Sequence, residues 1–183
     1  SHLDKLLMLF LLNEVFVGKF YAVWQISAVL LLAIEALNKA YVPYLYSQIR
    51  NENYSFITLV KYSVLSMIIF CLLWIISYDY QVLLVKYILP TEYHTLVNFA
   101  PILIFTHFLH GIYLVFVNVL FYFEKAIIIS SITIFTMLSF IVSFYLLAHS
   151  EQIVIYSYVI AALVKLILVL GFIICGNRKY EAC

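Results

Sequence analysis

The chain has 183 residues, of which 67% are apolar and only 10% are Asp, Glu, Lys or Arg, and its mean hydropathy is +1.11. Soluble domains carry about 25% charged residues, so this composition excludes an ordinary water-soluble fold. Ten basic and nine acidic residues leave a net charge of +1, which does not indicate a nucleic-acid-binding surface. The chain is therefore predicted to be a membrane protein.

Apolar runs follow one another along the chain with short polar connections. A bilayer-crossing helix needs about 20 residues, and in hydrocarbon every backbone polar group must be paired within the segment. A short first run, 6–12, is expected to be the second half of a helix whose start is missing. The alternative is a membrane span that places Asp4 and Lys5 inside the bilayer. Five longer runs are each expected to be a membrane-spanning helix: 15–37, 56–78, 97–123, 127–148 and 153–175.

The segment between the third and fourth of these six runs contains a short apolar stretch, 82–89, closed by Pro90. An interfacial helix is favoured there over a seventh crossing, because the stretch is too short to span. No domain boundary or internal repeat is evident. The sequence thus predicts one transmembrane domain, 1–183, of the all-α class: a polytopic helix bundle forming one six-helix lobe, with about five full spans and part of a first.

The distribution of basic residues between the loops predicts the orientation. Lys5 and Lys165 lie inside apolar runs and are set aside. Lys19 and Lys86 fall on one side of the membrane, and six basic residues fall on the other: Lys39, Arg50, Lys61, Lys125, Arg178 and Lys179. Because basic residues are retained in the cytoplasm, we expect a multi-pass membrane protein with a cytoplasmic C-terminus.

Polar residues inside the apolar runs are the candidate functional residues, because a charge at mid-bilayer costs about 2.5–3.5 kcal/mol and normally faces a partner or a wet cavity. In the run 15–37 and just after it, Glu35 and Lys39 are four residues apart and can pair along a helix. The alternative is an interfacial pair that reaches water.

The run 97–123 places His107, His110 and Asn118 on one helical face. Two imidazoles three residues apart could relay protons or contact a substrate phosphate. They are only weak evidence for a metal site, because no carboxylate lies on the same helical face. Hydrogen bonding to a neighbouring helix is the alternative.

The last two apolar runs each carry polar residues on one helical face. The hydroxyls of the run 127–148 are expected to bond their own helix or to let another helix approach. They belong to Thr133, Thr136, Ser139 and Ser143. Lys165 lies near the centre of the run 153–175 with no acidic residue within four positions, so we expect a partner on another helix or a wet cavity.

No catalytic motif, metal site or cofactor motif is found in the sequence. The segment 36–46, with Asn38, Ala40, Tyr41, Pro43 and Tyr44, resembles the end of the eighth helix in the O-antigen repeat-unit (Wzx-type) flippases of the multidrug/oligosaccharidyl-lipid/polysaccharide exporter superfamily. Three further passages resemble the same family: Leu3–Lys5, Gly18–Ala22, and the stretch from Glu92 through Pro101, Gly111 and Asn118 to Tyr122.

The family has two lobes of six helices, so the resemblance implies that this chain is the C-terminal lobe and that the N-terminal lobe is missing. It implies transport of an undecaprenyl-diphosphate-linked oligosaccharide across the bacterial inner membrane by alternating access. Stacked spans with short loops and inward polar groups, without a catalytic motif, also indicate a carrier and not an enzyme. Departures from the family pattern are Ser139 and Ser143 in place of two Asn, the absence of a Gly-rich turn over 149–155, and Lys39 in place of a neutral residue.

On this reading Lys5, Lys39 and Lys165 are candidates to contact the diphosphate, while Asp4 and Glu35 would offset them or accept protons. His107, His110 and Asn118 complete the candidate substrate-binding set. The alternative function is a membrane-embedded glycan polymerase or acyltransferase of the same pathway. Its catalytic groups would come from the loop 79–95, which offers Asp79, Lys86, Glu92 and His94.

Overall fold

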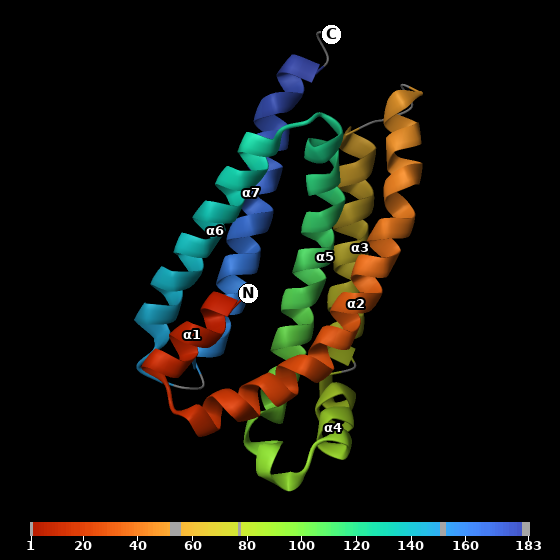
Figure 1. Cartoon of the computed structure of the whole chain (residues 1–183). Coiled ribbons are helices and arrows are strands. Elements are labelled where there is room, and N and C mark those ends of the chain that lie inside the picture. The colour runs from red at the N-terminus through yellow and green to blue at the C-terminus, as the bar shows by residue number, and fades with distance from the viewer. Residues whose placement is uncertain (1, 52–55, 77, 151–152, 181–183) are drawn as a thin grey trace.

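The computed structural model describes residues 2–51, 56–76, 78–150 and 153–180. Within these residues the chain forms helices joined by short connections, and no strand is present. The α-helices are α1 (His2–Leu11), α2 (Glu14–Arg50), α3 (Phe56–Ile76), α4 (Tyr78–Ile88), α5 (Ala100–Tyr122), α6 (Ala126–Leu147) and α7 (Tyr156–Tyr180). Two 3₁₀ helices, η1 (Thr91–Phe99) and η2 (Ile153–Ile155), precede α5 and α7 (Figure 1). The predicted all-α polytopic membrane bundle is confirmed.

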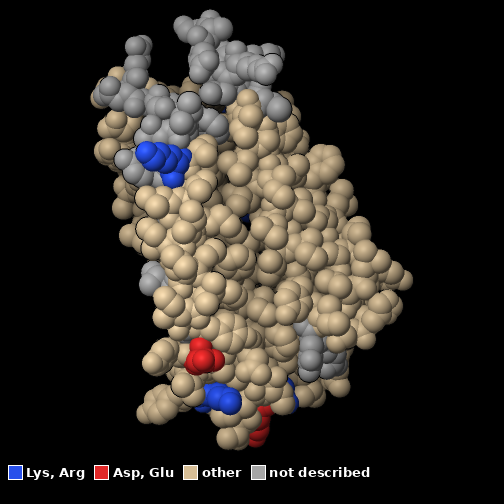
Figure 2. All heavy atoms as spheres, turned by 180° about the vertical axis from the view of Figure 1, so that it is seen from behind, with Lys and Arg blue, Asp and Glu red and all other residues tan. Residues whose placement is uncertain are grey.

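Four helical segments of the described chain are long and apolar enough to cross a membrane singly: Glu14–Arg50, Thr91–Tyr122, Ala126–Leu147 and Ile153–Ile174. A fifth span results if α3 and α4, whose axes differ by 62°, are taken together as one broken helix. On the face shown in Figure 2, charged side chains lie toward the two ends of the bundle, and the broad surface between them carries almost none. This distribution fits a bilayer around the middle of the bundle.

The short apolar stretch before Pro90 is part of α4, which begins at Tyr78 and is a separate helix, as the sequence predicted. Its eleven residues are too few to cross a bilayer alone. Its position at the membrane interface stays a prediction.

Helix α5 is the centre of the bundle. It lies between α2 and α7 and also contacts α3, α4 and α6 (Figure 1). More than half of its side chains are buried, including Leu103, Leu109 and Phe116. α6 packs mainly against α7 and keeps many apolar side chains exposed, such as Ile134 and Leu138. Exposed apolar side chains on a spanning helix are stable against lipid, whereas a central helix must be covered on all sides.

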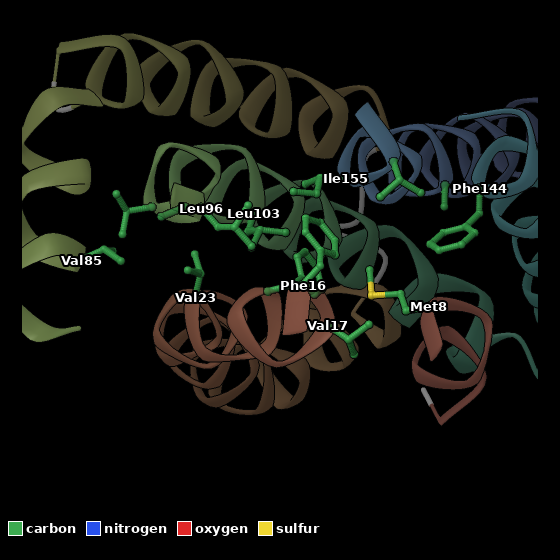
Figure 3. Packing of buried hydrophobic residues seen from close by; sticks show 14 of the residues in the cluster. Met8, Phe16, Val17, Val23, Val85, Leu96, Leu103, Phe144 and Ile155 are labelled. Carbon is green, nitrogen blue, oxygen red and sulfur yellow. The ribbon is translucent and has the colours of Figure 1, made fainter. Parts of the chain in front are cut away.

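Two apolar clusters hold the helices together. The first joins α1, α2, α4, η1, α5, α6 and α7, and Figure 3 shows Met8, Phe16, Leu96 and Phe144 directed into it. The second joins α2, α5, α6 and α7. On α5 the first cluster reaches Leu103 and the second begins at Leu109. A level of the bundle therefore lies between the clusters, and it contains the polar residues Thr106, His107, Thr133, Thr136 and Lys165.

The short connection between α5 and α6 fixes these helices as neighbours. Glu124 in this turn has φ 55°, the left-handed region that most side chains avoid. The conformation lets the Lys125 N–H donate to the Leu120 carbonyl at 3.0 Å. Near the N-terminus of the chain, the Asn13 side chain accepts a hydrogen bond from the Val15 N–H and caps α2.

Gly111 is the point of closest approach between α5 and α2. A Cβ built at this position would lie 2.8 Å from Ile34 Cγ2. Ile is branched at Cβ and has little rotamer freedom in a helix, so moving Ile34 aside costs free energy. The missing side chain at position 111 therefore permits the α2–α5 contact.

Gly111→Ala is expected to destabilise the fold by about 1–3 kcal/mol, because the added methyl must push α2 away from α5. The measurement is thermal unfolding of the full-length protein in detergent. Gly18→Ala is the matched control, since nothing lies within 4 Å of a Cβ there, and its stability should be unchanged or raised by up to about 1 kcal/mol. Equal stability of Gly111→Ala and wild type would contradict the close contact.

Candidate functional site

A cavity of about 400 Å³ opens between α2, α5, α6 and α7, at the level between the two apolar clusters. Its size falls in the range of small-molecule sites, about 300–1,000 Å³. Its polar lining comes from α5, α6 and α7, namely Thr106, His107, His110, Thr133, Thr136 and Lys165. Three of the predicted substrate-binding residues are thus brought together, from two helices that are far apart in the sequence.

Lys165 reaches from α7 to α5. Its Nζ lies 3.4 Å from His110 Nδ1 and 3.9 Å from the centre of the Tyr113 ring. An ammonium group can only donate, so Nδ1 accepts and the neutral imidazole carries its proton on Nε2. The second contact is a cation–π interaction. The prediction that Lys165 has a partner on another helix or faces a cavity is confirmed, since both are present.

His107 lies one turn before His110 and is 6% exposed. The edge of its ring meets Trp24 of α2, with ring centres 5.7 Å apart. Its Nε2 has no hydrogen-bond partner among the residues that the structure describes. A buried unpaired nitrogen costs free energy, typically about 1–3 kcal/mol.

The threonine hydroxyls of the cavity are bonded to their own helices. Thr106, Thr133 and Thr136 donate to the carbonyls four residues earlier, at 3.0, 2.9 and 2.7 Å. One of the two expectations for the run 127–148, bonding within its own helix, is therefore confirmed for Thr133 and Thr136. Because each hydroxyl hydrogen is already used, the oxygens can offer the cavity only lone pairs.

Trp24 is a cavity residue that the sequence analysis did not select. An aromatic residue in an apolar run has the same pattern whether it faces lipid, core or a cavity. Only its polar N–H could have indicated a functional position, because a buried indole N–H usually has a hydrogen-bond partner.

Asn118 does not line the large cavity. Its Nδ2 donates to Asn38 Oδ1 of α2 at 2.7 Å, so hydrogen bonding to a neighbouring helix, the alternative to a substrate contact, is what the structure shows. Asn38 also lines a second, smaller cavity of about 270 Å³ between α2, α3 and α5, whose lining is almost entirely apolar.

The other predicted charges lie elsewhere. Glu35 on α2 is half-buried and Lys39 is exposed, and neither lines the large cavity. The expected pairing of the two is not seen, since neither belongs to a salt bridge between described residues. The side chains of Asp4 and Lys5 lie outside the described residues. Roles of these four residues in substrate binding stay predictions.

The described lining of the cavity is cationic. Its described lining contains Lys165 and two histidines but no Asp or Glu. No group of three His, Cys, Asp or Glu side chains is placed to hold a metal ion in the described part of the chain. The arrangement can hold an anionic or strongly polar group inside a membrane-spanning bundle.

Comparison with known proteins gives one relative. The chain is similar to "Lsg locus putative protein 1" of Haemophilus influenzae, with 29% identity over 156 residues. The match covers 82% of this chain and 38% of the relative, so the chain spans about two fifths of the length of that protein. No family model and no solved structure matches the chain.

The Asn38–Asn118 hydrogen bond predicts a coupling between the two residues. Asn38→Ala and Asn118→Ala should each lower stability, and the double variant should be more stable than the sum predicts by about 0.5–1.5 kcal/mol. The measurement is unfolding of the four proteins of the cycle in detergent. Strict additivity would show that the amide pair contributes nothing to the α2–α5 contact.

Proposed function

We propose that this chain is part of a flippase that moves a lipid-linked oligosaccharide across a bacterial inner membrane, with an undecaprenyl-diphosphate anchor as the lipid. The observation that carries the proposal is Lys165, a cation inside a multi-pass bundle that faces a cavity without a carboxylate in its described lining. The relative's name supports a role in glycan synthesis, since it refers to the Lsg locus, a lipooligosaccharide-related locus.

The physical problem of such transport is solvation. Sugar hydroxyls and a diphosphate must cross about 30 Å of hydrocarbon that offers them no hydrogen bonds. A cavity with an ammonium group, imidazoles and hydroxyl oxygens replaces part of the lost hydration, while the prenyl tail stays in lipid. The cavity of this chain would alternate between the two sides of the membrane by movement against a second lobe, as in transporters built from two repeats.

The alternative, a glycan polymerase or acyltransferase, needs reactive groups at the membrane surface. His94 is one of the four candidates for that role. Its Nε2 lies 3.0 Å from both the Lys86 and the Leu89 carbonyls, so it donates its proton to backbone and joins the end of α4 to η1. A histidine engaged in this way is suited to holding a turn, which favours transport over the enzymatic alternative.

Lys165→Ala is expected to lower the amount of surface glycan about tenfold or more when it replaces the wild-type gene in the source bacterium. A tenfold loss corresponds to about 1.4 kcal/mol of transition-state stabilisation. Lys165→Arg should retain part of the activity, because it keeps the charge. The lipid-linked oligosaccharide should accumulate on the cytoplasmic side, where its accessibility to an added glycosidase can be measured in inverted vesicles.

Lys61→Ala is the matched control, since Lys61 is exposed on α3 and does not line the cavity. Both variants must be present in the membrane in wild-type amounts. Normal surface glycan in Lys165→Ala at normal abundance would contradict the proposed role of the cavity. Accumulation of unpolymerised glycan on the outer side would instead support the enzymatic alternative.

A further inference from the structure

The smaller cavity, of about 270 Å³, lies between α2, α3 and α5. Both α2 and α3 pack against α5, but in the described residues they make hardly any contact with one another. α3 is attached to α5 at one end of the cavity, where Phe70 stacks on Phe108 with ring centres 3.5 Å apart. The Trp74 N–H strengthens this attachment by donating to the Pro101 carbonyl at 2.8 Å. Beyond it, the cavity separates α3 from α2.

The lining of this cavity is apolar except near the connection between α2 and α3. Its three polar residues are Asn38, Tyr41 and Ser63, which belong to the second half of α2 and the first half of α3. Consecutive antiparallel helices bring these halves to the same end of the cavity. No charged side chain lines the cavity in the described residues.

Two hydrogen-bond donors at the polar end have no partner in the described part of the chain. Asn38 Oδ1 accepts from Asn118, which leaves the Asn38 Nδ2 hydrogens unused. The Tyr41 hydroxyl makes no hydrogen bond to a described residue. Neither group is among the buried polar atoms without a partner, so both are accessible to a ligand. An acceptor oxygen placed at this end would satisfy them.

The surroundings supply a ligand for the apolar part. Leu37 lines the cavity and is 71% exposed, so the cavity is open to the bilayer around the spanning helices. Apolar cavities of about 150 Å³ already stay free of water and take up apolar molecules. A hydrocarbon chain is therefore the ligand that fits the space between Ile34 and Phe108.

The polar end selects the group to which that chain is attached. Neutral donors without a cation suit a neutral acceptor, such as the carbonyl of an acyl ester. A phosphate would bring a negative charge into an uncharged lining, which costs free energy. An acyl chain of a phospholipid thus fits better than a prenyl chain, which is joined directly to phosphate.

We infer that the cavity between α2, α3 and α5 binds one acyl chain of a membrane phospholipid, with the chain against Phe108 and Ile112 and its ester carbonyl on Asn38 and Tyr41. The bound chain joins α3 to α2 where the protein leaves them apart. This site is separate from the large cavity and does not depend on the proposed function.

The test is native mass spectrometry of the full-length protein in detergent, titrated with dioleoyl phosphatidylglycerol. Val115 is half-buried and lines the cavity, so Val115→Phe fills it and should raise the Kd of the lipid at least about tenfold. Val142→Phe is the matched control, because it adds the same ring to an exposed position of α6, and its Kd should equal that of wild type. An unchanged Kd in Val115→Phe would overturn the inference.

The hydrogen bonds to the ester are tested without filling the cavity. Wild type should bind the diester lipid more tightly than its diether analogue, which has the same chains but no carbonyl. Tyr41→Phe should raise the Kd of the diester lipid about twofold to tenfold, as expected for one hydrogen bond, and leave that of the diether unchanged. Equal binding of the two lipids by wild type would contradict the assignment of the polar end.

Undecaprenyl phosphate is the competing ligand. At equal concentration it should not displace the phospholipid from wild type, because its phosphate follows directly on the chain. Displacement that is lost in Val115→Phe would assign the cavity to a prenyl lipid and overturn the phospholipid site.

Discussion

Hydrocarbon offers no hydrogen bonds, and this constraint governs the whole structure. Every backbone polar group in the spanning segments must be paired locally, which restricts the described chain to helices. The same constraint applies to side chains. Thr106 and Ser27 donate to their own helices, Trp74 donates to the Pro101 carbonyl across to α5, and Asn38 and Asn118 pair with one another.

Polar groups that remain unsatisfied after this local pairing are rare in the described bundle, which makes their position informative. His107, whose Nε2 is buried without a partner among the described residues, and Lys165 both line the same cavity. Apolar clusters lie on both sides of this level on α5, since Leu103 belongs to one cluster and Leu109 to the other. The polar level thus lies between two packed regions, an arrangement suited to a rigid binding site.

The sequence by itself determined the class of the protein and the approximate spans. Length and hydropathy are sufficient for this, because a bilayer requires about 20 apolar residues per crossing whatever the neighbours are. The ends of the helices were harder to predict from the sequence. α2 continues to Arg50, well past the apolar run that ended at 37, because polar residues can extend a helix into water without leaving an apolar trace.

Only the tertiary structure decided which polar residues meet. Helical spacing grouped His107, His110 and Asn118 on one face of α5, but the neighbours of that face differ along its length. His110 contacts Lys165 of α7, whereas Asn118 contacts Asn38 of α2. A periodic pattern gives the direction of a side chain from its own helix axis. The distance to the next helix depends on packing, and that distance determines whether a polar residue binds a ligand or another helix.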